Sequence, residues 1–350
     1  MGRSADRLHN LVGATRSEIA AWLADIDPRP YRAEQVYQWV TRRLAASLDD
    51  MTDLPKSLRA SLAARLAVWD PAVVDSIEAP DGTVKLALAF DDGAIVEAVV
   101  MPMEGHATVC LSSQTGCAVG CRFCVTGALG AGRNLTGGEI FGQYRAIVRH
   151  ASLGGRPLNV VFMGMGEPML NLDGLTRSLE LLAETVSPRR ITVSSSGIVP
   201  GLERLGRLAR RPNLAVSLNA TTQEQRRRLM PGAARWPLSE LLAALRAYPL
   251  ERGRRITIEY VLIDGINDSL EDARRLPVLL RGLPVKVNLI PLNSDDTYLA
   301  DLRPPGEERI DAFAAQLAAA HLNVTVRWSR GREVGAACGQ LRGRLLTAGP

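Results

Sequence analysis

The sequence predicts an α/β fold, a partial (β/α)6 barrel that carries a small N-terminal helical domain and a β-hairpin adaptor. Short apolar strands alternate with amphipathic helices from about residue 107, which is typical of a parallel sheet buried on both faces. About six such units occur rather than eight, so we expect a barrel that is open on one side. The predicted boundaries are 1–72 for the helical domain, 73–105 for the adaptor and 106–350 for the barrel.

The N-terminal domain is predicted from three apolar series at helical spacing. Thr15–Glu18 is a capping-box pattern that opens the first helix, and residues 27–30, Asp-Pro-Arg-Pro, end it. The second and third series run over residues 36–44 and 58–66. This domain is small and rich in arginine, so it is either a structural cap or an appendage that docks on RNA.

The adaptor is predicted as two strands, 84–90 and 94–100, around the turn Asp91–Gly93. Side chains alternate along a strand, so Glu97 shares its face with apolar neighbours. A carboxylate in that position is either an ion-paired rim residue or a base whose pKa is raised by burial.

The barrel units are predicted from short apolar runs and from the helical patterns between them. The strands are expected at 107–111, 159–163, 191–195, 214–218, 256–262 and 285–291, and the main helices at 138–150, 175–185, 238–246 and 269–280. Functional residues should then lie at the carboxyl ends of the strands.

Composition excludes several classes of protein. The chain has 350 residues, 46% hydrophobic and 23% charged, which excludes a disordered polypeptide. No run of about 18 uncharged apolar residues occurs, and the start lacks the apolar segment of a signal peptide, so we expect a cytoplasmic protein without a membrane partner. A net charge of +5 permits a nucleic-acid partner without establishing one.

The five cysteines are the most informative residues. An odd, clustered set in a cytosolic protein favours metal or redox chemistry over disulfides. Cys117, Cys121 and Cys124 have the spacing C-x3-C-x2-C, which can hold three irons of a [4Fe–4S] cluster and leave the fourth open. The alternative is a zinc knuckle that borrows a distant ligand. The spacing resembles that of radical S-adenosylmethionine (radical SAM) enzymes, in which the open iron binds SAM.

Polar groups follow the later strands. The second strand ends in Gly164-Met-Gly-Glu-Pro168, where glycines allow a ligand to approach the backbone and Glu167 can accept hydrogen bonds from the SAM ammonium. Ser194–Gly197, Ser217–Asn219 and Pro291–Asn293 end three further strands. Each is by itself an ordinary turn or cap, but together they outline a polar ring for ribose, carboxylate and adenine.

Five motifs spread over nearly the whole chain carry one further resemblance. They are Arg32–Trp39, Glu97–Pro102, Cys110–Cys117, Met163–Pro168 and Ala336–Leu341. With these motifs the sequence resembles the RlmN/Cfr family of radical SAM RNA (adenosine) methyltransferases, most closely its RlmN branch.

The resemblance implies a role for each candidate residue. Cys338 carries a methyl group, Cys110 resolves the intermediate and Glu97 accepts a proton. The implied cluster ligands are Cys117, Cys121 and Cys124, and the implied SAM contacts are Gly166, Glu167, Ser194, Ser217, Leu218, Asn219 (histidine in some members) and Asn293. The implied cofactors are a [4Fe–4S] cluster and two SAM molecules per turnover.

The chemistry of adenine explains why such residues are needed. C2 is electron-poor and has no lone pair to attack a sulfonium methyl group, so a radical route is required. One SAM methylates Cys338, and a radical from a second SAM takes a hydrogen from that methyl group, which then adds to the ring. Release needs a base and a second thiol, roles that suit Glu97 and Cys110, with a transient Cys110–Cys338 disulfide. The alternative for both cysteines is an inert buried thiol.

We therefore expect methylation of adenosine C2 in 23S rRNA near the peptidyl transferase centre and in tRNA 3′ of the anticodon, both by family resemblance. The alternatives are C8 methylation, as in the Cfr branch, and a non-catalytic iron–sulfur RNA-binding protein. The expected partners are RNA and an electron donor such as flavodoxin or ferredoxin, and the expected state is a monomer. Arginine runs such as 226–228 are typical of solvated helix faces, whereas Arg327, Arg330 and Arg332 flank Cys338 and are expected to contact phosphate.

Overall fold

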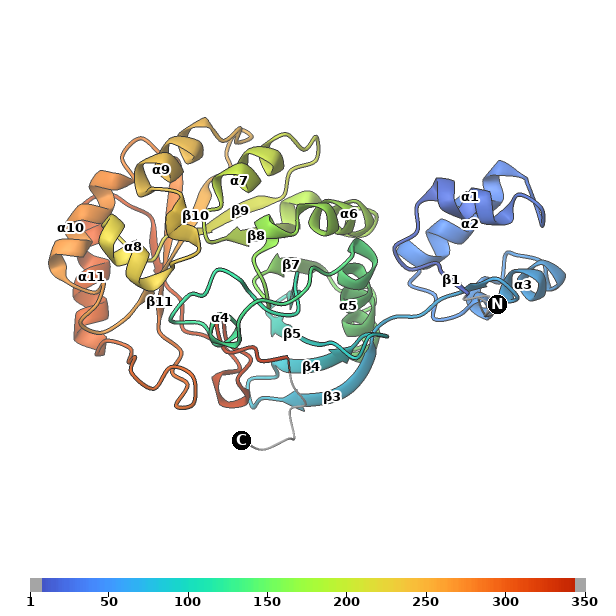
Figure 1. The fold of residues 1–350 in the computed structure, drawn as a ribbon, viewed down its shortest axis with the longest axis horizontal. Coiled ribbons are helices and arrows are strands. Elements are labelled where there is room, and N and C mark those ends of the chain that lie inside the picture. Colours follow the sequence, from blue (N-terminus) through green and yellow to red (C-terminus); the bar gives the residue numbers. More distant parts are fainter. Residues whose placement is uncertain (1–7, 344–350) are drawn as a thin grey trace, which may run out of the picture.

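A computed structural model describes residues 8–343 and contains a ten-stranded sheet with the strand order β12-β11-β10-β9-β8-β7-β6-β5-β4-β3 (Figure 1). The strands are β3 (Ala72–Glu78), β4 (Val84–Ala89), β5 (Ile95–Met103), β6 (His106–Cys110), β7 (Leu158–Phe162), β8 (Ile191–Ser195), β9 (Asn213–Ser217), β10 (Ile256–Leu262), β11 (Val285–Pro291) and β12 (Val324–Val326). Strands β6 to β12 are parallel, and β3 to β6 pair antiparallel. The predicted α/β fold with six parallel strands is confirmed, and β12 adds a seventh parallel strand that the sequence pattern did not predict.

Helices follow the strands and cover the outer face of the curved sheet, as α5, α6, α7, α9, α10 and α11 show in Figure 1. The helices of the barrel are α4 (Val125–Leu129), α5 (Gly137–His150), α6 (Leu172–Leu182), α7 (Val199–Gly206), α8 (Gln223–Leu229), α9 (Leu238–Ala247), α10 (Leu270–Leu279) and α11 (Glu307–Ala319). Helix α5 illustrates why they form: Thr136 and Glu139 make a capping box, and the side chains of Ile140, Phe141 and Ile147 are buried. Helices α4, α7, α8 and α11 were not predicted.

The predicted hairpin is the antiparallel end of this same sheet. Strand β5 pairs with β4 on one side and with β6 on the other, so the hairpin is hydrogen-bonded directly to the first barrel strand. Strand β3, which no sequence pattern predicted, pairs with the far side of β4. The side chain of Glu97 on β5 therefore lies within a continuous sheet rather than on an isolated ribbon.

The N-terminal residues form α1 (Arg16–Leu23), α2 (Pro30–Thr41) and α3 (Lys56–Ala63), at the right of Figure 1. The predicted capping box of Thr15 and Glu18 is present at α1. Proline at the first position of α2 costs no hydrogen bond, so Pro30 opens this helix as well as following the first. Strands β1 (His9–Asn10) and β2 (Leu66–Ala67) pair parallel and close this unit, a feature that was not predicted.

Buried contacts join the N-terminal helices to the barrel. The Arg145 guanidinium on α5 is fully buried, pairs with Asp70 (Nε to Oδ1, 2.6 Å) and donates to the carbonyl oxygens of Val40 and Ala45. Gly13 has φ +96°, and a Cβ there would lie 2.5 Å from the Gly138 Cα atom. Only glycine, which has no Cβ, allows these two backbone segments to come this close. Within residues 8–343, no helix is long and apolar enough to cross a membrane.

Candidate active site

A cavity lies at the carboxyl ends of strands β7 to β11, where the predicted fold places functional residues. Nine of the predicted site residues line it: Cys117, Cys121, Cys124, Gly166, Glu167, Ser194, Ser217, Asn293 and Cys338. The fold thus brings together residues that lie more than 200 positions apart in the chain.

The loop that carries Cys117, Cys121 and Cys124 is fixed through its backbone. The Cys117 N–H donates to the carbonyl oxygen of Gly130 (2.7 Å), and the Arg122 N–H donates to that of Leu229 at the end of α8 (3.0 Å). Burial raises the pKa of the Cys117 thiol to about 12 and also raises the pKa values of the thiols of Cys121 and Cys124. Buried thiols of this kind ionise when a metal binds, because the cation replaces the proton.

Glu167 lies in the loop that follows β7 and is held by two backbone N–H groups. Its carboxylate accepts hydrogen bonds from the N–H groups of Ser196 (2.7 Å) and Met169 (3.0 Å). Burial raises the pKa of Glu167, whereas these hydrogen bonds oppose the rise. The preceding Gly166 has φ +100°, and a Cβ there would lie 2.6 Å from the Gln114 Cβ. The tight turn that aims Glu167 at the cavity therefore requires glycine.

The segment that carries Cys338 is tied to the cysteine loop. The N–H of Val125, the residue after Cys124, donates to the carbonyl oxygen of Gly339 (2.7 Å). The Thr126 hydroxyl donates to the carbonyl oxygen of Leu341 (2.7 Å). Asn293 donates to the carbonyl oxygen of Cys338 itself (3.0 Å), so the predicted SAM contact also positions the predicted methyl carrier. These bonds keep Cys338 at the wall of the cavity.

A second, smaller cavity is lined by Cys110, Arg327 and Cys338 together. Both cysteines are free thiols. Burial, and secondarily the nearby Cys338, raises the pKa of Cys110 to about 12, while Arg327 opposes that rise. Because Cys338 borders both cavities, it stands between the three clustered cysteines and the remaining cysteine of the chain.

Glu97 does not line either cavity. It is 1% exposed, its carboxylate lies 3.5 Å from the Lys85 ammonium, and it accepts a hydrogen bond from the Arg342 N–H (2.9 Å). Burial raises the pKa of Glu97, and the Lys85 charge opposes this. Lys85 also donates to the carbonyl oxygen of Gly335 (3.2 Å), so this ion pair anchors the Cys338 segment to β4 and β5.

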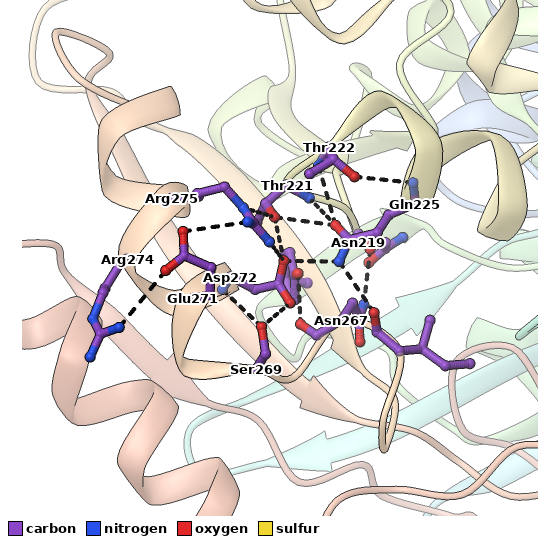
Figure 2. Close-up of polar contacts among 12 residues, drawn as sticks. Asn219, Thr221, Thr222, Gln225, Asn267, Ser269, Glu271, Asp272, Arg274 and Arg275 are labelled. Atoms are coloured by element: carbon purple, nitrogen blue, oxygen red, sulfur yellow. Dashed lines mark hydrogen bonds and ion pairs between the residues drawn. The ribbon is translucent and has the colours of Figure 1, made fainter.

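Two predicted SAM contacts, Leu218 and Asn219, are not among the residues that line the cavity. Asn219 has φ +53°, a region in which asparagine is common, and its side chain accepts a hydrogen bond from the Val261 N–H (2.8 Å). It belongs to a buried polar network (Figure 2) in which Asn267 donates to the Asn219 carbonyl oxygen and Asp272 accepts from Thr221. In this conformation Asn219 ties β9 to β10.

Glu259 on β10 was not predicted as a site residue, and Arg327 was expected to contact phosphate. Glu259 lines the large cavity; one carboxylate oxygen accepts from Asn288 (3.1 Å), and the other has no partner among the described residues. Its signal was an acid inside an apolar strand, the same signal that identified Glu97. Arg327 faces the two cysteines of the small cavity, and Arg330 pairs with Asp81 (3.1 Å). Contact of these arginines with phosphate stays a prediction.

Two family models match the chain. The Radical SAM superfamily model matches residues 111–276, and the ribosomal RNA large subunit methyltransferase N-terminal domain matches residues 9–68. Radical SAM enzymes bind a [4Fe–4S] cluster and SAM. The donor set fits both, because three partly buried thiols of one short loop line a cavity that Glu167 and serine hydroxyls also line. Cys338 lines the same cavity from a separate segment of the chain.

Relatives match over almost the full length. The dual-specificity RNA methyltransferase RlmN of Anaeromyxobacter sp. (strain Fw109-5) is 47% identical, over 96% of this chain and 88% of its own. The RlmN of Geobacter sulfurreducens is 44% identical, over 97% and 94%. A crystal structure of a radical SAM methyltransferase from Sphaerobacter thermophilus is 46% identical, with a TM-score of 0.90 and coverage of 96% and 99%. The chain therefore belongs to the RlmN family of radical SAM RNA methyltransferases.

Proposed function

We propose that the protein methylates C2 of adenosine in 23S rRNA and in tRNA, with Cys338 as the methyl carrier. The observation that carries this proposal is the position of Cys338 between two cavities, one with Cys117, Cys121 and Cys124 and the other with Cys110. A carrier has to meet the source of the radical and, later, the thiol that releases it. The names of the relatives, dual-specificity RNA methyltransferases, support two kinds of RNA substrate.

The first half of the reaction loads and activates the carrier. The Cys338 sulfur attacks the methyl carbon of one SAM and displaces S-adenosylhomocysteine, so a new S–CH3 bond forms, the sulfonium S–CH3 bond breaks and the thiol proton is lost. When bound, the cluster supplies the electron that cleaves a second SAM to methionine and a 5′-deoxyadenosyl radical. Cys338 gives up one methyl hydrogen to that radical, and its methylene carbon then bonds to C2 of the adenine.

The second half releases the product. The adduct has to lose one electron and the C2 proton, which restores the aromatic ring; a bound cluster would accept that electron. Cys110, as thiolate, then attacks the Cys338 sulfur; the S–S bond forms, the S–CH2 bond breaks, and the carbon takes a proton to become methyl. An external reductant, flavodoxin or ferredoxin, supplies the first electron for SAM cleavage, which the adduct later gives back, and the two electrons that reduce the disulfide in each turnover.

Glu97 is our candidate for the group that accepts the C2 proton. Its burial favours the protonated form, which makes its carboxylate a stronger base than an exposed one. Its carboxylate is engaged by Lys85 and by the Arg342 N–H, so the Arg342 backbone has to shift before Glu97 can reach an adenine. The target base must also leave its stack to reach the cavity.

The same proposal includes the setting of the enzyme. We assign RNA docking to the helical domain 1–72, connection to the adaptor 73–105, and chemistry to 106–350. We further propose a monomer in the cytoplasm. The match to an rRNA methyltransferase N-terminal domain supports the assignment of the first domain.

The test is to incubate the anaerobically reconstituted protein with 23S rRNA, or with tRNA, together with SAM and reductant, and to identify the nucleosides by mass spectrometry. The expected product from each RNA is 2-methyladenosine. Formation of 8-methyladenosine would replace the proposal by the C8 alternative. Cleavage of SAM without methyladenosine in either RNA would overturn it, as would RNA binding without SAM cleavage.

A further inference from the structure

The side chain of Arg226 on α8 is buried, although its neighbours in the sequence are typical of a surface position. It is the first of three consecutive arginines, and its neighbours Arg227 and Arg228 are exposed to solvent. Arg226 is 0% exposed. The run therefore contains two surface arginines and one in the interior of the barrel.

The buried guanidinium is only partly satisfied by the protein. One terminal nitrogen, Nη2, donates to the carbonyl oxygens of Ser196 (2.8 Å) and Ala233 (3.4 Å). The other two nitrogens, Nε and Nη1, have no hydrogen-bond partner among the described residues. A buried cation with unused donors is costly unless a negative group compensates for it.

The contacts of α8 place Arg226 beside the loop that carries Cys117, Cys121 and Cys124. The cluster loop lies against the end of α8, since the Arg122 N–H donates to the Leu229 carbonyl oxygen (3.0 Å) and the Gly232 N–H to the Val119 carbonyl oxygen (3.0 Å). Burial lowers the pKa of Arg226 to about 10, while Cys121 and Glu167 oppose this, so the side chain is charged at neutral pH. The N–H of Ser196 donates to Glu167, and the carbonyl oxygen of Ser196 accepts from Arg226. The cation therefore lies on the side of the cavity that holds Glu167 and Cys121.

We propose that Arg226 is the buried counter-charge of the iron–sulfur cluster and raises its reduction potential. A cluster with three thiolates is negatively charged, and one more electron makes it more so. A fixed cation beside it therefore stabilises the reduced form more than the oxidised form. The inference rests on the proposed role of Cys117, Cys121 and Cys124 as ligands.

The test uses reconstituted holoenzyme without RNA and measures the midpoint potential of the cluster by a redox titration followed by electron paramagnetic resonance. Arg226→Gln removes the charge and keeps a donor for Ser196, whereas Arg226→Lys keeps the charge. In the Gln variant we expect the ratio of reduced to oxidised cluster at a fixed potential to fall at least about tenfold, equivalent to 59 mV for one electron. The Lys variant and the surface control Arg228→Gln should match the wild type.

Equal midpoint potentials of the cluster in the Gln, Lys and wild-type proteins, at equal iron content, would overturn the proposal. Arg226 would then have a structural role only. Should the Gln variant not fold, wild-type holoenzyme labelled with ¹⁵N in its arginine guanidinium groups decides the matter. Pulsed paramagnetic resonance of the reduced cluster should then detect a ¹⁵N coupling that Arg226→Lys abolishes, and its absence would refute the counter-charge. A Cys121→Ala protein with a full iron complement would instead refute the ligand assignment.

Discussion

Replacing Arg145 by methionine should loosen the N-terminal domain from the barrel. Arg145 is fully buried on α5, pairs with Asp70, and donates to the carbonyl oxygens of Val40 and Ala45. Methionine has a similar length but no charge and no donor. The variant therefore leaves two carbonyl oxygens without their partner and removes one cation from a carboxylate that is 4% exposed.

The expected loss in the free energy of unfolding is about 3–5 kcal/mol, the cost of breaking a buried ion pair by removing one partner. This is a large part of the roughly 5–15 kcal/mol that stabilises a typical protein. Arg149 is the matched control, because it contacts the same Asp70 carboxylate (2.5 Å) with a side chain that is 38% exposed. Arg149→Met should cost about 1 kcal/mol or less, because solvent screens an exposed ion pair.

Urea unfolding followed by circular dichroism and by tryptophan fluorescence measures both variants. Trp22, Trp39 and Trp69 report on the N-terminal part, so their transition should move to lower urea in Arg145→Met. Reductant-driven SAM cleavage without RNA should persist, since the cavity residues are untouched. Equal losses in the Arg145 and Arg149 variants, or a loss below about 1 kcal/mol in Arg145→Met, would refute the reasoning.

Two further predictions concern the carrier and the resolving thiol. With SAM deuterated in its methyl group, deuterium should appear in 5′-deoxyadenosine, because the hydrogen comes from the methyl on Cys338; label found only in the RNA product would exclude the two-SAM route. Since burial raises the pKa of Cys110 to about 12, its reactive thiolate increases with pH, and decay of the protein–RNA adduct in a single turnover should accelerate about tenfold per pH unit between roughly pH 7 and 9. An adduct that decays at a rate independent of pH would contradict the role of Cys110.

Local patterns predicted the elements that have strong local signals. The capping box at Thr15 and the apolar strands of the barrel depend on neighbours in the chain, and the structure contains both. The glycine turn before Glu167 was also predicted, although the close contact that requires Gly166 is with Gln114, which is distant in the chain. Strand β12 is only three residues long, and its backbone pairing with β11 is what makes it a strand. Such pairing depends on residues distant in sequence, so no local pattern reveals it.

The site residues likewise divide into those that a local sequence signal predicts and those whose position depends on distant residues. Residue type and spacing indicated the three clustered cysteines and Glu167, and the structure places them around one cavity. The inward orientation of Arg226 and Arg327 could not be predicted, because an arginine run has the same composition on a surface and in an interior. The polar network around Asn219 likewise depends on Asn267 and on Asp272 of α10, which are distant in the chain.

The central claim, that Cys338 carries the methyl group and Cys110 releases it, is tested most directly by comparing Cys110→Ala with Cys338→Ala. The Cys110 variant can still be methylated and attack adenine but cannot form the disulfide, so RNA should accumulate covalently bound through Cys338, as a heavier band that collapses after ribonuclease treatment. The Cys338 variant should form neither methylcysteine nor this band. Absence of the band in Cys110→Ala while SAM cleavage continues, or its appearance in Cys338→Ala, would contradict the account.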